Sequence, residues 1–286
     1  MVYAVIDVGS NSVRLMYSDG TNTLGKWIKI TRLAEGLVKT GIINETALER
    51  TASAVSFFVD KARSDLIKDI FIFATAGVRQ AKNSACFINK VKELTGINVD
   101  VISGEEEAKI GAIGALENRD GAIIDIGGAS TEISILNSGK IVYNKSIDIG
   151  AVRLTERFGQ YFNEVREFVK EEVKLFDKFN NLDVYGIGGT ATSLAGLILQ
   201  LEPYDPTKTH GYKLSKKSVY NCVEQLYSLS VEDRKKLKGM HKDRAEILPA
   251  GATILLELMD YLGIDYVFVS EKDNLEGYLR MKLEIL

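Results

Sequence analysis

The sequence contains very little cysteine, histidine and proline. Among its 286 residues there are two cysteines, two histidines and three prolines. Cys86 and Cys222 are too few for a disulfide framework, and we expect both to be buried, reduced thiols of a cytoplasmic protein. Two histidines argue against an imidazole-based zinc site and against a His-Asp metal hydrolase.

Long apolar runs and a basic excess are also missing. No stretch approaches the roughly 20 apolar residues of a membrane span, and the first residues lack the basic and apolar segments of a secretory signal. A formal net charge of −3 argues against a general nucleic-acid binder. We therefore expect neither a nucleic-acid nor a membrane partner, and a homodimer is left open.

A glycine turn between two acidic residues is the most distinctive stretch. Apolar residues run into Asp125, Gly127 and Gly128 form the turn, and an alternating strand resumes around Glu132, which together predict a hairpin. Hard divalent cations prefer carboxylate oxygens, and glycines free backbone N–H groups to face an anion. The stretch predicts a metal and phosphate site in which Asp125 and Glu132 hold the metal.

The same order of residues occurs 118 positions earlier. An apolar strand ends at Asp7, and Gly9, Ser10, Asn11 and Ser12 form a polar turn before a second strand. A single Asp-x-Gly turn would give roughly even odds of a purely structural role, because such turns are common between strands. Two copies favour two related domains that face a shared ligand, with this turn supplying donors around phosphate groups.

The pattern of strands and helices predicts an α/β protein of two domains. The first domain is expected to span residues 1–118 and the second 119–286, separated by a polar turn. The last helix, about residues 275–286, is a candidate to pack back on the first domain. The expected strands are residues 2–7, 12–17, 26–31, 70–75, 99–102, 122–126, 131–136, 140–147, 184–187 and 266–269.

A third, weaker repeat of this pattern is a glycine turn at Gly188, Gly189 and Thr190, which joins a strand to a helix. Glycines before a helix N-terminus can form an anion site. They can equally serve close packing of the helix on the sheet, and the residues alone leave both readings open.

An ordered set of motifs resembles the exopolyphosphatase and guanosine pentaphosphate phosphohydrolase family over nearly the whole chain. The motifs are Ile6-Asp7-Val8-Gly9-Ser10-Asn11-Ser12, Arg32-Leu33-Ala34-Glu35-Gly36-Leu37, Ala74-Thr75-Ala76-Gly77-Val78-Arg79, Ser103-Gly104-Glu105-Glu106-Glu107-Ala108, Asp125-Ile126-Gly127-Gly128, Gly188-Gly189-Thr190-Ala191-Thr192 and Ala250-Gly251. The resemblance implies two actin-like (ribonuclease H-like) domains, each a mixed sheet flanked by helices, with the active site in the cleft between them.

The resemblance also implies roles for particular residues. Acidic residues suit a helix N-terminus, which suffices to explain Glu105 and Glu106, whereas similarity to the family places the catalytic base at Glu107. Arg79 could form an ordinary salt bridge, but the family's strand-end arginine favours a phosphate clamp. By the same likeness, Arg32 is expected to assist at the phosphate.

The wider superfamily implies that Gly189 and Thr190 lie near the bound substrate. Three positions depart from the family pattern: Ala129 stands where a third glycine is usual, and Asp273 and Leu275 replace a glycine and an arginine. The chain length resembles the short two-domain form, without the additional helical domain of longer members.

The expected activity is removal of a terminal phosphate from inorganic polyphosphate, guanosine pentaphosphate or both. Water is the nucleophile, Glu107 the general base and Mg²⁺ the cofactor. An ATP-dependent small-molecule kinase is one alternative. An actin-like switch that binds a nucleotide without rapid hydrolysis is the other, and Glu107 in its Glu-Glu-Glu-Ala setting is the feature that favours the hydrolase over both.

Overall fold

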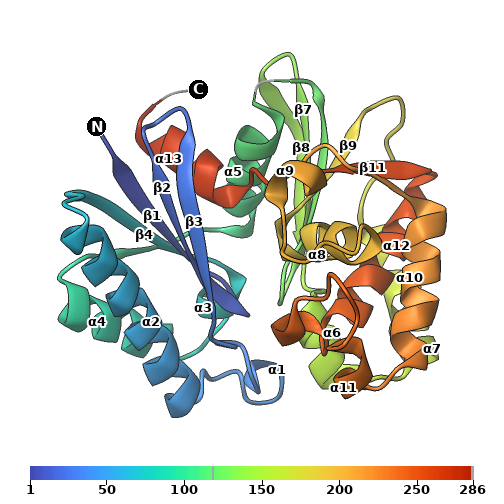
Figure 1. Cartoon of the computed structure of the whole chain (residues 1–286), viewed down its shortest axis with the longest axis horizontal. Coiled ribbons are helices and arrows are strands. Elements are labelled where there is room, and N and C mark those ends of the chain that lie inside the picture. Colours follow the sequence, from blue (N-terminus) through green and yellow to red (C-terminus); the bar gives the residue numbers. More distant parts are fainter. Residues whose placement is uncertain (118, 285–286) are drawn as a thin grey trace.

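Two β-sheets with flanking helices lie side by side in a computed structural model that describes residues 1–117 and 119–284 (Figure 1). The first sheet has the order β3-β2-β1-β4-β5 and the second β10-β11-β9-β6-β7-β8. Their strands are β1 (Tyr3–Val8), β2 (Ser12–Ser18), β3 (Thr23–Ile30), β4 (Asp69–Ala74), β5 (Val99–Val101), β6 (Gly121–Ile126), β7 (Thr131–Asn137), β8 (Lys140–Ile147), β9 (Val184–Ile187), β10 (Lys213–Ser215) and β11 (Tyr266–Val269).

Helices connect the strands and cover the sheets. They are α1 (Leu37–Thr40), α2 (Glu45–Ser64), α3 (Ala76–Arg79), α4 (Ser84–Thr95), α5 (Gly104–Leu116), α6 (Ala151–Phe158), α7 (Phe162–Glu172), η1 (Val173–Leu175), α8 (Gly188–Ile198), α9 (Pro206–Thr209), α10 (Lys216–Ser228), α11 (Val231–Arg234), η2 (Lys242–Arg244), α12 (Leu248–Leu262) and α13 (Asn274–Lys282).

Both sheets are built in the same way. In each, three antiparallel strands, β1–β3 or β6–β8, are followed by strands that pair in parallel with the first of them, β4 with β1 and β9 with β6. The α/β prediction with two mixed sheets is therefore confirmed. The predicted domain boundary at residue 118 and the last two residues, 285–286, lie outside the described part of the chain.

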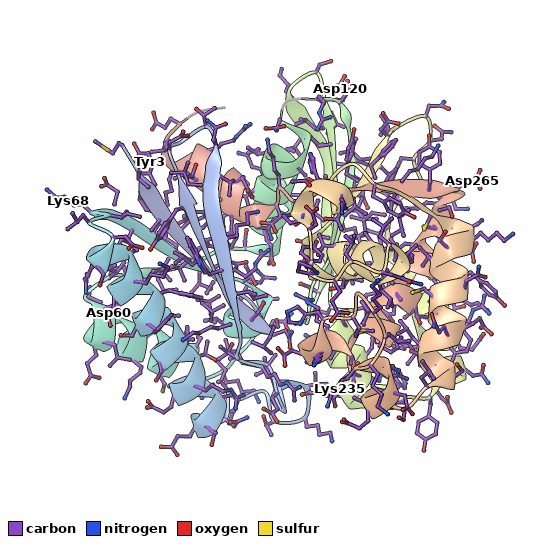
Figure 2. All side chains as sticks on the ribbon, viewed as in Figure 1. Tyr3, Asp60, Lys68, Asp120, Lys235 and Asp265 are labelled. Atoms are coloured by element: carbon purple, nitrogen blue, oxygen red, sulfur yellow. The ribbon has the colours of Figure 1, made fainter. Side chains whose placement is uncertain are left out.

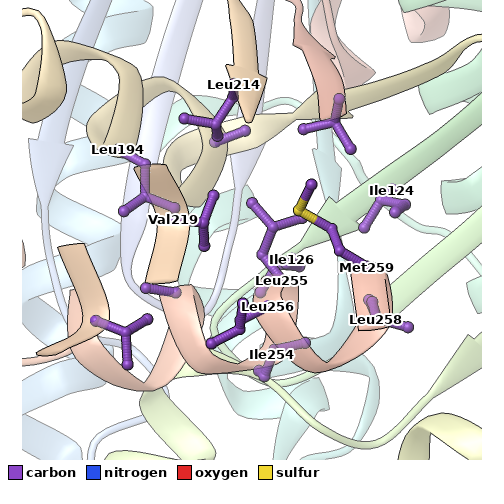
Figure 3. Packing of buried hydrophobic residues seen from close by; sticks show 14 of the residues in the cluster. Ile124, Ile126, Leu194, Leu214, Val219, Ile254, Leu255, Leu256, Leu258 and Met259 are labelled. Atoms are coloured by element: carbon purple, nitrogen blue, oxygen red, sulfur yellow. The ribbon is translucent and has the colours of Figure 1, made fainter. Parts of the chain in front are cut away.

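The core of the second sheet is organised around α12. Nearly every residue of this helix is buried, and its side chains pack with those of β6 and α8, including Ile124, Ile126 and Leu194 (Figure 3). Pro249 lies in the first turn of the helix, where a missing N–H costs nothing. A helix that is apolar on most of its faces is enclosed by neighbouring elements, and α12 packs in this way against α8, which borders the site described below.

Helix α13 packs against the first sheet although it follows the second. Leu275, Tyr278 and Leu279 form a cluster with residues of β1 and β4, among them Val5 and Phe73. The Tyr278 ring is stacked on that of Phe73, with centroids 4.4 Å apart. Helix α13 thus covers the sheet with which the chain begins.

Glycines allow α13 to lie directly against α5. A Cβ atom at Gly277 would stand 1.7 Å from the carbonyl oxygen of Ile110, and one at Gly114 would stand 2.0 Å from that of Asp273. Both obstacles are backbone atoms that cannot rotate away. This close approach places the first residues of α13 between the two sheets.

Some local expectations were wrong. The predicted burial of Cys86 is contradicted: its side chain is exposed, because α4 buries only the face that carries Phe87 and Val91, whereas Cys222 is buried. The short strand β10 was missed, since three residues are too few for a recognisable alternation. Among the described helices, none combines the length and apolar character that crossing a bilayer requires.

Candidate active site

A cavity of about 820 Å³ lies between the two sheets and is bordered by both glycine turns. Most residues predicted for the site line it. These are Asp7, Gly9, Ser10, Asn11, Ser12, Glu107, Asp125, Gly127, Gly128, Gly189 and Thr190. Segments from across the sequence thus converge on one space.

The two turns have the same geometry. The N–H of Gly9 donates to the carbonyl of Ser12 over 3.0 Å, and the N–H of Gly127 donates to that of Ser130 over 2.9 Å. The residues of each pair are 118 positions from their counterparts, as the sequence repeat requires. The repeat is therefore structural as well as sequential.

The turns also touch each other. A Cβ at Gly128 would lie 2.8 Å from the Cβ of Ser10, and one at Gly150 would lie 2.5 Å from the carbonyl oxygen of Gly128. Ala129, the departure from the family pattern, is absent from the residues with positive φ, so its methyl group causes no backbone strain. Close contact at this point brings Asp7 and Asp125 to the same cavity.

Asp7 is held by a half-buried arginine, Arg14, that the sequence analysis missed. Nε of Arg14 donates to Oδ2 of Asp7 over 2.9 Å, and the same guanidinium pairs with Asp273. Burial raises the pKa of Asp7, whereas Arg14 and Lys26 lower that of Asp273 despite its burial. Oδ1 of Asp7 is buried and has no hydrogen-bond partner among the described residues. This oxygen is free to meet a cation or a donor.

Asp125 lies at the N-terminus of α8. A Cβ at Gly188 would come within 2.5 Å of Oδ1 of Asp125, and Nδ2 of Asn274 donates to Oδ2 over 3.2 Å. The N-terminus of a helix favours a negative charge, yet burial raises the pKa of Asp125 to about 6. The α8 N-terminus, expected to bind substrate, is thus partly occupied by the protein's own carboxylate.

Glu132 stands directly opposite Asp125 in the β6–β7 pair. It is 1% exposed, accepts a hydrogen bond from the Ser146 hydroxyl at 2.6 Å, and does not line the cavity. Burial, with the nearby charges of Glu107 and Asp125, raises its pKa well above the ordinary value. Glu132 therefore lies behind Asp125 rather than on the wall that a ligand would meet.

Glu107 is the carboxylate of the acidic helix start that reaches the cavity. Glu106 forms a capping box with Ser103, which satisfies the helix terminus, and Glu105 is exposed. The side chain of Glu107 is buried, and burial raises its pKa to about 7 although the adjacent Arg79 guanidinium opposes the shift. Near neutral pH, both the ionised and the protonated form of Glu107 are therefore populated.

The two predicted arginines lie outside the cavity wall. Nη1 of Arg79 donates to Oε2 of Glu107 and to the carbonyl of Ile102, both over 2.9 Å. Arg32 faces a different cavity, and its guanidinium is 3.7 Å from Glu246. The structure thus joins Arg79 to the predicted base and separates Arg32 from the other site residues; a phosphate contact for either stays a prediction.

Arg244 is a second cation that the sequence analysis did not select. Its guanidinium lines the cavity and covers Gly189, where a Cβ would stand 2.0 Å from Nη2. No carboxylate in the described part of the chain lies within ion-pair distance of it, and burial lowers its pKa to about 10. A half-buried guanidinium that faces an open space fits an anionic ligand.

A signal for Arg14 was present in the sequence. The offset of 118 that maps Asp7 onto Asp125 also maps Arg14 onto Glu132, and Arg14 stands opposite Asp7 as Glu132 stands opposite Asp125. No such signal was present for Arg244, because it lies in a charged segment, residues 241–244, of the kind that usually forms a solvent-exposed surface.

The carboxylate oxygens at the cavity are of the type that a hard divalent cation such as Mg²⁺ prefers as ligands. Asp125 and the unpartnered Oδ1 of Asp7 are oxygen ligands on the wall. Within residues 1–117 and 119–284, no group of three or more histidine, cysteine or acidic side chains is placed to hold a metal alone. Water and substrate phosphate would have to complete its shell, as is usual for Mg²⁺, and the position of Glu132 makes it the weaker of the two predicted ligands.

Known proteins of similar sequence share the fold described above. The sequence pattern of the Ppx/GppA phosphatase family matches residues 14–284. A structure of the Aquifex aeolicus family member is 29% identical and superposes with a TM-score of 0.81, covering 100% of this chain and 98% of that one.

Three curated relatives are similar over most of this chain. A bifunctional 3-dehydroquinate synthase/phosphatase of Fusobacterium nucleatum is 32% identical over 96% of the chain, and exopolyphosphatase 2 of Mycobacterium tuberculosis is 30% identical, with 96% of both proteins covered. A guanosine-5'-triphosphate,3'-diphosphate pyrophosphatase of Vibrio atlanticus is 30% identical over 92% of the chain. The chain spans 45% of the first relative's length and 56% of the third's.

Proposed function

Because this chain belongs to the Ppx/GppA phosphatase family, we propose that it hydrolyses the terminal phosphoanhydride bond of inorganic polyphosphate, guanosine pentaphosphate or both. An exopolyphosphatase and a guanosine-5'-triphosphate,3'-diphosphate pyrophosphatase are each 30% identical to it. The observation that carries the proposal is the buried Glu107 carboxylate on the wall between the two aspartate turns. A nucleotide switch needs no rapid turnover and therefore no base at that place, and a kinase would use a base only on an acceptor hydroxyl.

In this mechanism the protein mainly positions and stabilises charge, as phosphoryl transfer requires. Backbone and side-chain donors of the Ser10–Ser12 turn and the Arg244 guanidinium hold phosphate oxygens in the cavity. The oxygen of a water molecule bonds to the terminal phosphorus while the Glu107 carboxylate accepts a proton from that water. The bridging P–O bond breaks, so that orthophosphate and a chain one phosphate shorter are released.

Arg79 has a supporting role in the proposal. Its hydrogen bond to Oε2 fixes the orientation of Glu107 and leaves Oε1 for water. Bound Mg²⁺, held by Asp125 and Asp7 with Glu132 behind them, would neutralise phosphate charge and withdraw electron density from phosphorus. A cytoplasmic location remains the expectation from composition.

Side-by-side assays of phosphate release test the proposal. We expect wild-type protein with Mg²⁺ to release phosphate from polyphosphate, guanosine pentaphosphate or both, and we expect chelation of the metal to stop release until Mg²⁺ is restored. Transfer of phosphate from ATP to a metabolite, with no release from either substrate, would support a kinase instead. Tight nucleotide binding with negligible turnover would support a switch.

The pH dependence of kcat/KM should reveal the buried base. Only ionised Glu107 can accept a proton, so the rate should fall as pH drops through about 7, the pKa that burial imposes. Arg79 favours the ionised form, and its removal in Arg79→Gln should therefore move this acid limb to higher pH. An acid limb near the ordinary glutamate value of about 4.3 would contradict the assignment.

A further inference from the structure

A second cavity, of about 560 Å³, lies beside the main one between the same two parts of the molecule. Strand β3 separates the two cavities: Ile28 lines the main cavity, and the next residue, Lys29, lines the second. The opposite wall is shared in the same way by Arg244 and Asp243. The second cavity, which we call the β3 pocket, therefore adjoins the main cavity along β3 and η2.

The walls of the β3 pocket carry more positive than negative charge. Lys29, Arg32 and Arg50 line it together with a single carboxylate, that of Asp243. The two arginines are partly balanced from outside the pocket: Arg50 pairs with Glu35 at 3.1 Å, and Arg32 lies 3.7 Å from its nearest carboxylate.

Lys29 supplies the least compensated charge. Its ammonium lies 3.2 Å from the centre of the Phe57 ring. Across residues 1–117 and 119–284, no carboxylate oxygen lies within ion-pair distance of it. An aromatic ring stabilises an ammonium less than a phosphate oxygen does in a partly enclosed site. Lys29 is thus available to an anion.

Thr31 adds a hydrogen-bond donor without a partner. Its side chain is 2% exposed, lines the β3 pocket, and its Oγ1 makes no hydrogen bond within the described part of the chain. Buried hydroxyl groups normally have partners because losing one costs free energy. The backbone N–H groups of Thr31 and Arg32 both donate to the carbonyl of Asn11, at 3.0 and 2.9 Å. The pocket is therefore anchored on the turn that borders the main cavity.

We propose that the β3 pocket binds the distal phosphates of a linear polyphosphate whose terminal phosphate occupies the main cavity. Lys29 and the Thr31 hydroxyl would contact their oxygens. The proposal rests on the proposed function, because it assumes that the main cavity holds the reacting phosphate. It makes chain length a determinant of affinity.

Calorimetric titration with tripolyphosphate and with a long polyphosphate tests this proposal. The protein carries Glu107→Gln throughout, which prevents loss of ligand through turnover. Adding Lys29→Gln should weaken binding of the long chain about two- to five-fold, the effect of one partly exposed ion pair, and leave tripolyphosphate binding unchanged. High salt should shrink the difference, because it screens exposed charges.

Lys68→Gln is the matched control, since this lysine lies on the outer side of the first sheet, away from both cavities (Figure 2). Lys29→Arg should restore long-chain affinity. Equal weakening of both ligands, or of neither, would overturn the proposal. Phosphate release by protein with an intact Glu107 is measured in parallel: absence of release together with the length-dependent difference would refute the hydrolase assignment and retain the pocket.

Discussion

Glu107→Gln should bind polyphosphate or guanosine pentaphosphate with nearly wild-type affinity and lose about 10²- to 10⁴-fold in kcat, the usual contribution of a general base. The amide has almost the shape of the carboxylic acid and can still accept a hydrogen bond from Arg79, but it cannot take a proton from water. Initial rates of phosphate release give kcat, and titration of the variant gives affinity.

Glu105→Gln provides a matched control. It removes the same charge two residues away on the same helix, from a side chain that is exposed, and its rate should equal that of wild type. A Glu107→Gln variant that released phosphate at the wild-type rate would show that Glu107 is not the base. Thermal unfolding should show both variants folded, since Glu105 is exposed and burial already disfavours the ionised form of Glu107.

Gly277→Ala should unfold at a temperature about 5–10 °C below wild type, because a Cβ at this position would meet the carbonyl of Ile110 at 1.7 Å. Overpacking against backbone costs about 1–3 kcal/mol or more, and each kcal/mol shifts the melting temperature of a protein of this size by about 2–4 °C. Calorimetry of the purified variant measures the shift.

The same variant should also lose activity below its melting temperature. Displacing α13 moves Asp273 and Asn274, which contact Arg14 and Asp125. Lys282→Ala, which removes one half-exposed ion pair from the same helix, should keep activity and most of the stability. Wild-type stability in Gly277→Ala would mean that α13 does not require this close approach to α5.

Most of the fold could be predicted because its signals are local. Alternation before and after each Asp-Gly turn indicated the hairpins, and the strands expected at residues 184–187 and 266–269 have the predicted bounds. Short or irregular pieces such as β10 were missed. Cys86 was wrongly predicted to be buried because the residue type alone does not reveal which face of α4 is outside.

The sequence predicted the turns and the acidic helix start of the site, whereas its two arginines depend on contacts between residues that are far apart in the sequence. The turns with Asp7 and Asp125 and the helix start with Glu107 each have a local signature, and they do line one cavity. Arg14 pairs with a residue 259 positions away, and Arg244 meets Gly189 only through the packing of η2 on α8. Asp273, noted as a departure from the family pattern, proved to be the second partner of Arg14.

The sequence by itself determined the repeated strand-turn-strand unit and placed an aspartate beside each glycine turn, since a turn and its flanking strands depend on neighbouring residues. Only the tertiary structure decided which charges are buried together. It put Glu132 behind Asp125, Arg79 against Glu107 and Arg32 in the β3 pocket. Desolvation and Coulomb energy depend on every atom around a group, including atoms from remote segments, and for that reason the pKa of Glu107 is a property of the folded chain.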